Sequence, residues 1–181
     1  MIEIFILSLI QGVAEFLPVS SSSHLIIASE YLKLEKSLAI DVSLHLGSFL
    51  AVIVYFYKDV LNFYKDKIIF FKIIISSIPV MLVGFILVET NFIEKIRNIE
   101  TIAWTTLIFG VLLFVSDKFT IEKTIEKNFS FKSAIFIGSL QILALIPGVS
   151  RSGIAITAAR FLGFERVDSA KISFLISIPI L

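Results

Sequence analysis

Long apolar stretches separated by short charged loops fill most of this sequence, and they limit what it can fold into. Residues 44–57, 73–88 and 102–115 contain no Asp, Glu, Lys or Arg. Hydrophobic residues make up 57% of the 181 residues, charged residues make up 17%, and the mean hydropathy is +0.97. A soluble domain could hardly cover such a sequence with polar surface. Because a membrane-spanning helix needs about 20 apolar residues, and because these stretches lack the alternation of a barrel strand, the sequence predicts an all-α integral membrane protein, a multi-span helical bundle.

Net charge and cysteine content exclude several other classes. The net charge is +1, so no basic surface suggests that the chain binds nucleic acid. There is no cysteine, which removes a thiolate metal site from consideration. Residues 1–6 lack the basic region of a cleaved signal peptide, and we expect the first apolar segment to be retained. The sequence leaves open whether the protein forms a homodimer.

Two further apolar regions, residues 4–28 and 134–162, are interrupted near the middle by proline and small polar residues. We expect each to form a re-entrant helix hairpin. A broken helix is tolerated at membrane depth only where the freed backbone groups are buried in protein or line a watery cavity. The two breaks therefore indicate where a functional site would lie.

Loop charges predict an orientation for these segments. Two loops carry an excess of lysine: Lys58, Lys65, Lys67 and Lys72 in one, and Lys118, Lys123, Lys127 and Lys132 in the other. By the positive-inside tendency both are cytoplasmic, so residues 30–41 and the loop containing Glu89, Glu94, Lys95, Arg97 and Glu100 would face outward. The first hairpin would then enter from outside and the second from inside.

The two hairpins also align with each other, which suggests a duplication. Gln11 matches Gln141 and Pro18 matches Pro147, at offsets of 130 and 129 residues. We expect a single membrane domain made of an inverted repeat, with residues 1–90 as the first copy and residues 102–181 as the second.

The first polar run places a carboxylate within apolar sequence. Gln11 and Glu15 are four residues apart, so they share one helix face and can point at one ligand. An ionised Glu15 needs a cation or a hydrogen-bond donor in such surroundings. The alternative interpretation is structural, with Glu15 as the partner of a broken backbone or of a nearby arginine.

After Glu15 the run continues with proline, serines and a histidine. Pro18 is expected to end the first helix, and residues 20–23 supply four hydroxyl groups that suit a tight polar loop. His24 lies three residues beyond Ser21 and can serve as its base or protonate a leaving group. Serine runs are also common as helix caps, and a membrane histidine is often only hydrogen-bonded.

The second run, Pro147-Gly-Val-Ser-Arg-Ser-Gly153, sets one arginine among small residues before a helix expected to start near Ile154. Gly148 and Gly153 allow backbone N–H groups to approach a ligand, and the helix N-terminus favours an anion. Arg151 offers a planar fork that matches phosphate oxygens. Pairing of Arg151 with Glu15 is the structural alternative, and the two readings can hold in turn if Arg151 leaves Glu15 when a phosphate arrives.

These motifs together resemble the undecaprenyl-diphosphate phosphatase family of the bacitracin-resistance type. The resemblance rests on Gln11 with Glu15, on Pro18-Val-Ser-Ser-Ser-Ser-His24, on Leu46-Gly-Ser-Phe-Leu-Ala51 and on Pro147 to Gly153, and it covers nearly the whole chain. It implies a bacterial inner-membrane enzyme that removes the terminal phosphate of undecaprenyl diphosphate at a site open to the periplasm. Such enzymes recycle the lipid carrier for peptidoglycan synthesis, and they depend on a divalent cation such as Mg²⁺ or Ca²⁺.

Carried over by position, the resemblance implies catalytic roles for four residues: Glu15 as essential carboxylate, Ser21 as nucleophile, His24 as acid or base and Arg151 as phosphate clamp. It implies Glu15 and Gln11 as cation ligands. The residues expected to contact substrate are Gln11, Ser20, Ser22, Gly148, Ser150, Ser152 and Gly153. Direct attack by water, with Ser21 only positioning the phosphate, is a competing mechanism.

The sequence departs from the family pattern in several places. Gln11 replaces the first acidic residue of the pair, Ser23 stands where glycine is usual, and Ala155 stands where threonine is common, although Thr157 follows. Members of the family continue through further helices beyond the position of Leu181, so we expect the second repeat to be truncated. A carrier for polyprenyl phosphate or a small anion is the alternative function, because discontinuous helices in inverted repeats are typical of transporters.

Overall fold

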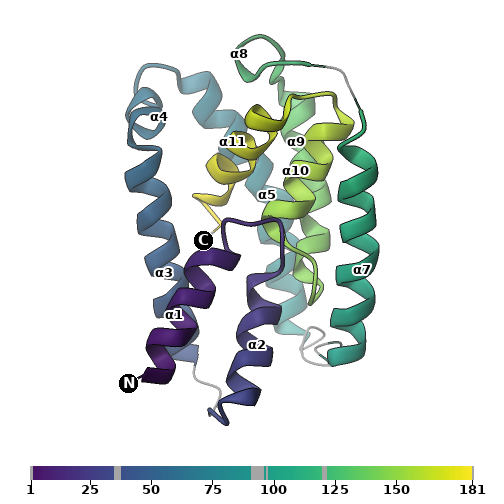
Figure 1. Ribbon diagram of the computed structural model, residues 1–181. Helices are drawn as coiled ribbons and strands as arrows, with labels where there is room; N and C mark the ends of the chain where they lie inside the picture. The colour runs from purple at the N-terminus through teal and green to yellow at the C-terminus, as the bar shows by residue number, and fades with distance from the viewer. Residues whose placement is uncertain (1, 35–37, 91–95, 97, 120–121, 181) are drawn as a thin grey trace.

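A computed structural model describes residues 2–34, 38–90, 96, 98–119 and 122–180, which form a bundle of helices (Figure 1). Among these residues the only β pairing is an isolated bridge between Lys123 and Phe164. The prediction of an all-helical chain is therefore confirmed. The elements are α1 (Ile2–Ala14), α2 (Ser21–Tyr31), α3 (Leu38–Tyr55), α4 (Tyr57–Asn62), α5 (Lys67–Glu89), α7 (Ile99–Ser116), α8 (Ile125–Asn128), α9 (Phe131–Leu140), the 3₁₀ helix η1 (Gln141–Leu145), α10 (Arg151–Phe161) and α11 (Arg166–Ser177).

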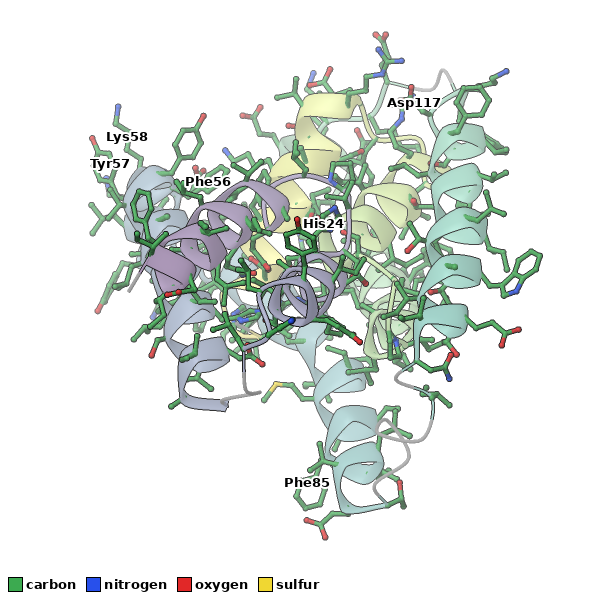
Figure 2. All side chains as sticks on the ribbon, turned by 60° about the horizontal axis from the view of Figure 1, so that its bottom comes forward. His24, Phe56, Tyr57, Lys58, Phe85 and Asp117 are labelled. Carbon is green, nitrogen blue, oxygen red and sulfur yellow. The ribbon has the colours of Figure 1, made fainter. Side chains whose placement is uncertain are left out.

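Helices α5 and α7 are long and apolar enough to cross a membrane, with 23 and 18 residues. Only 22% and 11% of their most apolar windows are buried, so most of their apolar side chains point away from the protein. Phe85 of α5 illustrates this, because its ring projects outward and is 68% exposed (Figure 2). Since a soluble protein rarely exposes so continuous an apolar surface, the helices are consistent with a protein embedded in lipid.

The predicted spans match α3, α5 and α7, but the loop expected at residues 58–72 is wrong in extent. Residues 57–62 form the short helix α4, and α5 already begins at Lys67. The reason is local: Asp66 caps α5 by accepting hydrogen bonds from the N–H groups of Ile68 and Ile69, both at 3.1 Å. Of the predicted outward loop, Glu94, Lys95 and Arg97 lie outside the described residues.

The two interrupted regions form two helix pairs, α1 with α2 and α9–η1 with α10. Their turns lie near the middle of the molecule, and the pairs open toward opposite ends of the bundle (Figure 1). Each limb is short: α1 has 13 residues, α2 and α10 have 11, and α9 with η1 has 10 and 5. At about 1.5 Å per residue for α-helix and about 2.0 Å for 3₁₀ helix, these limbs extend about 16–25 Å, less than the roughly 30 Å of a hydrocarbon core.

Both turns differ by a few residues from the sequence-based boundaries. Helix α1 ends at Ala14 rather than at Pro18, because Pro18 has no N–H to bond the carbonyl of Ala14 four residues earlier and its ring clashes with that carbonyl in a helix. Helix α10 begins at Arg151 rather than near Ile154, because Ser150 acts as its N-cap and accepts a hydrogen bond from Gly153 N at 3.1 Å. Arg151 is thus a helical residue.

The main core lies where α5, α9, α10 and α11 pack together. Small residues allow this: Ala134, Ala155, Ala158 and Ala159 are all at most 1% exposed. At Gly138 the helices come so close that an added Cβ would lie 2.0 Å from the carbonyl oxygen of Ser76. This core holds the second helix pair in place and therefore positions the N-terminus of α10.

Candidate active site

Glu15, the residue that follows α1, is the centre of a polar cluster between the two turns. Its Oε1 accepts a hydrogen bond from Arg151 Nη2 at 2.7 Å, and its Oε2 accepts one from Ser21 Oγ at 2.6 Å. Gln11, one turn earlier on α1, donates to the same Oε2 from Nε2 at 2.9 Å. Three of the sequence-predicted residues are thus brought to one carboxylate, whose side chain is only 9% exposed.

Ser21 and Arg151 reach Glu15 from equivalent positions in the two helix pairs. Ser20 is the N-cap of α2 and Ser150 is the N-cap of α10, so Ser21 and Arg151 are each the first residue of their helix. Two helix N-termini therefore meet at the same place. Because unpaired N–H groups and the helix dipole favour negative charge at such ends, the arrangement suits an anion.

A pocket opens beside Glu15 between the two turns, and its walls contain most of the predicted substrate-binding serines. Ser20, Ser21 and Ser22 line it from the first turn, and Ser150 and Ser152 line it from the second, together with Arg151. Ser20 also accepts a hydrogen bond from Ser23 Oγ at 2.9 Å. Hydroxyls, a guanidinium and helix N-termini are the groups that bind phosphate.

Ser152 joins the two turns directly. Its Oγ donates to the carbonyl oxygen of Leu17 at 2.9 Å. Gly153 permits this approach, because an added Cβ there would lie 3.3 Å from the carbonyl oxygen of Pro18 and 3.1 Å from Ser150 Cβ. The arrangement of the Glu15 cluster thus depends on small residues in the second turn.

Gly148 has a structural explanation that differs from the predicted contact with substrate. It has φ of +94°, and an added Cβ would lie 2.8 Å from the Ile102 carbonyl oxygen on α7. Thr105 and Thr106 of α7 donate to the carbonyl oxygens of Pro147 and Gly148 at 2.6 and 3.2 Å. The glycine thus allows α7 to hold the second turn. Thr157 likewise donates its hydroxyl to Gly153 O at 2.8 Å, within its own helix.

His24 is not brought to the cluster in the same way as Ser21. Its Nδ1 lies 2.7 Å from the carbonyl oxygen of Ser20, within the first turn of α2 (Figure 2). The residue is exposed, and among the described hydrogen bonds Ser21 Oγ donates to Glu15 and not to His24. The nearest base to the Ser21 hydroxyl is therefore the Glu15 carboxylate.

Two residues near Glu15 were missed by the sequence reasoning. His45 on α3 places Nε2 at 3.9 Å from Glu15 Oε2. Gln141, at the start of η1, is 2% exposed and lines a second pocket with Glu15 and Arg151. Within the described part of the chain its Nε2 has no hydrogen-bond partner. The alignment of Gln11 with Gln141 was a usable signal for the second, whereas His45 lies in an apolar stretch that offers no local signal.

Comparisons with known proteins agree with this chemistry. The family model described as "Bacitracin resistance protein BacA" matches residues 4–181. A protein of Pelagibacter ubique named undecaprenyl-diphosphatase is 50% identical over 180 residues, which cover 98% of this chain and 70% of that protein. Proteins of the same name from Jannaschia sp. and Teredinibacter turnerae are 40% and 42% identical, over 97% and 100% of this chain and 71% and 74% of their own lengths.

Proposed function

The chain belongs to the bacitracin resistance protein BacA family, and from this we propose that it is a membrane phosphatase that hydrolyses undecaprenyl diphosphate. The name of its relatives, undecaprenyl-diphosphatase, supports the substrate. The observation that carries the mechanism is the meeting of Ser21 and Arg151 on Glu15, each as the first residue of a helix. The products are undecaprenyl phosphate and inorganic phosphate, which returns the lipid carrier to peptidoglycan synthesis and gives resistance to bacitracin.

Substrate capture begins with an exchange of partners at Arg151. In the free protein its guanidinium neutralises Glu15 at 2.7 Å. A diphosphate brings more negative charge than one carboxylate and offers paired oxygens to the guanidinium fork, so Arg151 moves to the phosphate. The N-termini of α2 and α10 and the serines of the pocket supply further donors. Glu15, released from Arg151, is then free to accept a proton.

Ser21 Oγ then attacks the terminal phosphorus. The new O–P bond forms as the bond from phosphorus to the bridging oxygen breaks, and undecaprenyl phosphate leaves with that electron pair. The Ser21 proton passes to Glu15 Oε2 along their 2.6 Å hydrogen bond. Glu15 passes this proton to the departing phosphate group, and the resulting carboxylate deprotonates a water molecule that attacks the phosphoserine. As the new O–P bond forms, the bond between phosphorus and Ser21 Oγ breaks, Oγ takes the proton back from Glu15, and inorganic phosphate leaves. His24, with its Nε2 free of the Ser20 contact, is positioned at the surface to exchange protons with solvent or leaving group.

The cluster also fits a divalent cation. Gln11 is 1% exposed, and its Oε1 is a buried acceptor with no hydrogen-bond partner among the described residues. Together with Glu15 this supplies the oxygen ligands that Mg²⁺ or Ca²⁺ prefers. When bound, the cation would neutralise phosphate charge as the P–O bond breaks.

The short limbs of the two helix pairs support re-entrant hairpins that enter from opposite faces as an inverted repeat. The lysine-rich segments around α4 and α8 lie at one end of the bundle, and the N-terminus and the end of α2 lie at the other (Figure 1). With the lysine-rich end in the cytoplasm of a bacterial inner membrane, the first hairpin and its pocket open toward the periplasm.

The test is phosphate release from undecaprenyl diphosphate by the purified protein in detergent, with and without chelator. Ser21→Ala should lower the rate by about 10²–10⁴-fold, because it removes the attacking hydroxyl. Ser8→Ala is the matched control. Ser8 lies on α1, and in the described part of the chain its hydroxyl bonds only its own helix, at Ile4 O, 2.8 Å away. A wild-type protein that releases no phosphate but transports lipid phosphate equally well with Ser21→Ala would establish a carrier instead.

A further inference from the structure

The surroundings of His45 indicate a role that its position in the sequence does not show. Helix α3 packs beside α1, and His45 Nε2 lies 3.9 Å from Glu15 Oε2. Its side chain is 25% exposed and that of Glu15 is 9% exposed, so the two meet in a largely enclosed place. Arg151 binds the other oxygen, Oε1, and the Oε2 side of the carboxylate therefore faces neutral donors and the imidazole.

The other ring nitrogen determines which form of His45 faces Glu15. Nδ1 lies 2.8 Å from the carbonyl oxygen of Asp41, one helical turn earlier. A carbonyl oxygen can only accept, so Nδ1 carries the hydrogen, and the neutral ring presents a lone pair on Nε2. Histidine ligands in metal sites are usually held in this way, with the distal N–H bonded to a carboxylate or a backbone carbonyl.

Gln11 supplies a third atom on the same side. Its amide nitrogen donates to Glu15 Oε2 at 2.9 Å and to Ser48 Oγ at 3.4 Å, and its Oε1 has no hydrogen-bond partner among the described residues. Rotating the amide by half a turn places Oε1 at the position of Nε2. The two hydrogen bonds of Nε2 are then lost, and a bound cation between Oε1 and the carboxylate would replace them. Two ligands about 2.1 Å from one metal ion lie roughly 3.0–3.4 Å apart, so this pair has a suitable spacing, and His45 is within about 1 Å of it.

We propose that His45 Nε2, Glu15 Oε2 and Gln11 Oε1 form one cation site, in which the imidazole is a ligand that the sequence motifs do not include. This proposal rests on the proposed function, and it names the class of metal. An imidazole nitrogen suits first-row transition metals better than Ca²⁺ or Mg²⁺, whereas the two oxygen ligands suit Mg²⁺, Ca²⁺ and Mn²⁺ alike. With His45 as a ligand, the site should therefore bind Mn²⁺, the most weakly held ion of the transition series, more tightly than Ca²⁺. Arg151 remains free to bind the phosphate on the opposite side of Glu15.

The chain contains only two histidines, His24 and His45, which allows a direct test. Purified protein without a histidine tag is titrated with Mn²⁺ in detergent, and nitrogen coupling to the bound ion is measured by pulsed electron paramagnetic resonance. We expect coupling to imidazole nitrogen in the wild type and in His24→Gln. We expect its loss in His45→Gln, together with at least a tenfold rise in the Mn²⁺ dissociation constant and a smaller change for Ca²⁺.

A second measurement does not depend on whether His45→Gln folds. When the wild type and His24→Gln are labelled with ¹⁵N-histidine, the nitrogen coupling to Mn²⁺ should change from the pattern of ¹⁴N to that of ¹⁵N in both proteins. The proposal is overturned if the coupling survives in folded His45→Gln or disappears in His24→Gln. It is also overturned if Mn²⁺ binds to the wild type without any coupling to imidazole nitrogen. Absence of Mn²⁺ binding overturns it as well. If the histidine coupling is found but no phosphate is released with any cation, the site stands and the phosphatase assignment fails.

Discussion

At the scale of single residues, Glu15 explains how a charged group is kept within apolar helices. Its carboxylate accepts from Arg151, Ser21 and Gln11, so the negative charge is paired and hydrogen-bonded in the free protein. A buried charge without such partners would cost several kcal/mol. The same groups are the ones a diphosphate needs, because a guanidinium and a hydroxyl that bind a carboxylate can also bind a phosphate oxygen. The cluster therefore both stabilises the empty site and prepares it for substrate.

Gln141 is the match of Gln11 in the second run. Gln11 Nε2 donates to Glu15, whereas the buried Nε2 of Gln141 has no hydrogen-bond partner among the described residues. Replacing it with leucine removes a desolvated amide of similar volume, so we expect the free energy of unfolding to stay equal or to rise by up to about 1–3 kcal/mol. Thermal unfolding in detergent measures this. A loss of stability would show that the amide has a partner, such as a buried water.

At the scale of helices, close approach made possible by glycine organises the second helix pair. Gly138 on α9 packs against the backbone of Ser76 on α5, whereas Gly110 on α7 has nothing within 4 Å of its would-be Cβ. In lipid, where apolar side chains gain little by leaving the solvent, such close contacts carry much of the helix association. The position of α10, and with it Arg151, depends on this contact.

Gly138→Ala should therefore be strongly destabilising, because its Cβ would lie 2.0 Å from the Ser76 carbonyl oxygen and α5 and α9 would have to separate. We expect a loss of about 1–3 kcal/mol or more, with a fall in phosphate release as Arg151 moves. Gly110→Ala is the matched control and should be neutral or stabilising by up to about 1 kcal/mol, since it only improves helix propensity. Equal melting temperatures for the two variants would contradict the packing argument.

Sequence patterns located the two turns because proline and small polar residues interrupt apolar stretches there. They also paired Gln11 with Glu15 through their four-residue spacing, which the 2.9 Å hydrogen bond confirms. They did not predict that Ser21 and Arg151 both begin a helix, because that depends on which serine becomes the N-cap. Nor could they find His45, whose contact with Glu15 arises only when α3 packs beside α1.

At the scale of the whole molecule, charged residues tie the helix ends together at the lysine-rich end. Asp117, just after α7, accepts two hydrogen bonds from Arg166 at the start of α11, at 2.8 and 2.6 Å. Arg160, at the end of α10, donates to the carbonyl oxygens of Asp117 and Phe164 at 3.0 and 2.7 Å. One network therefore connects α7, α10 and α11.

The hydrogen bonds from Arg166, and its positive charge, lower the pKa of Asp117 below its ordinary value. A carboxyl group with a lowered pKa in the folded state stabilises the protein above its unfolded pKa, near 4, and loses this contribution as pH falls. Asp117→Asn should thus lower the melting temperature slightly at pH 7 and by less at pH 3. The effect is small because the Asp117 side chain is 39% exposed. An equal difference at both pH values would contradict an ionic origin.

The opposed helix pairs predict a topology that can be read from the membrane itself, because the chain has no native cysteine. Single cysteines can replace exposed residues at or next to the open ends of each pair. These are Ile2 and Tyr31 for the first pair, and for the second Phe131 and Val167, which lies at the start of α11 just after α10. In intact cells with a permeabilised outer envelope, a membrane-impermeant maleimide should label only the first two. In inverted inner-membrane vesicles it should label only the last two.

A re-entrant hairpin begins and ends on the same side of the membrane. Labelling of Ile2→Cys and Tyr31→Cys from different sides would therefore exclude a re-entrant first hairpin. Labelling of Tyr31→Cys and Val167→Cys from the same side would exclude the inverted arrangement, and with it the meeting of two helix N-termini from opposite faces at Glu15.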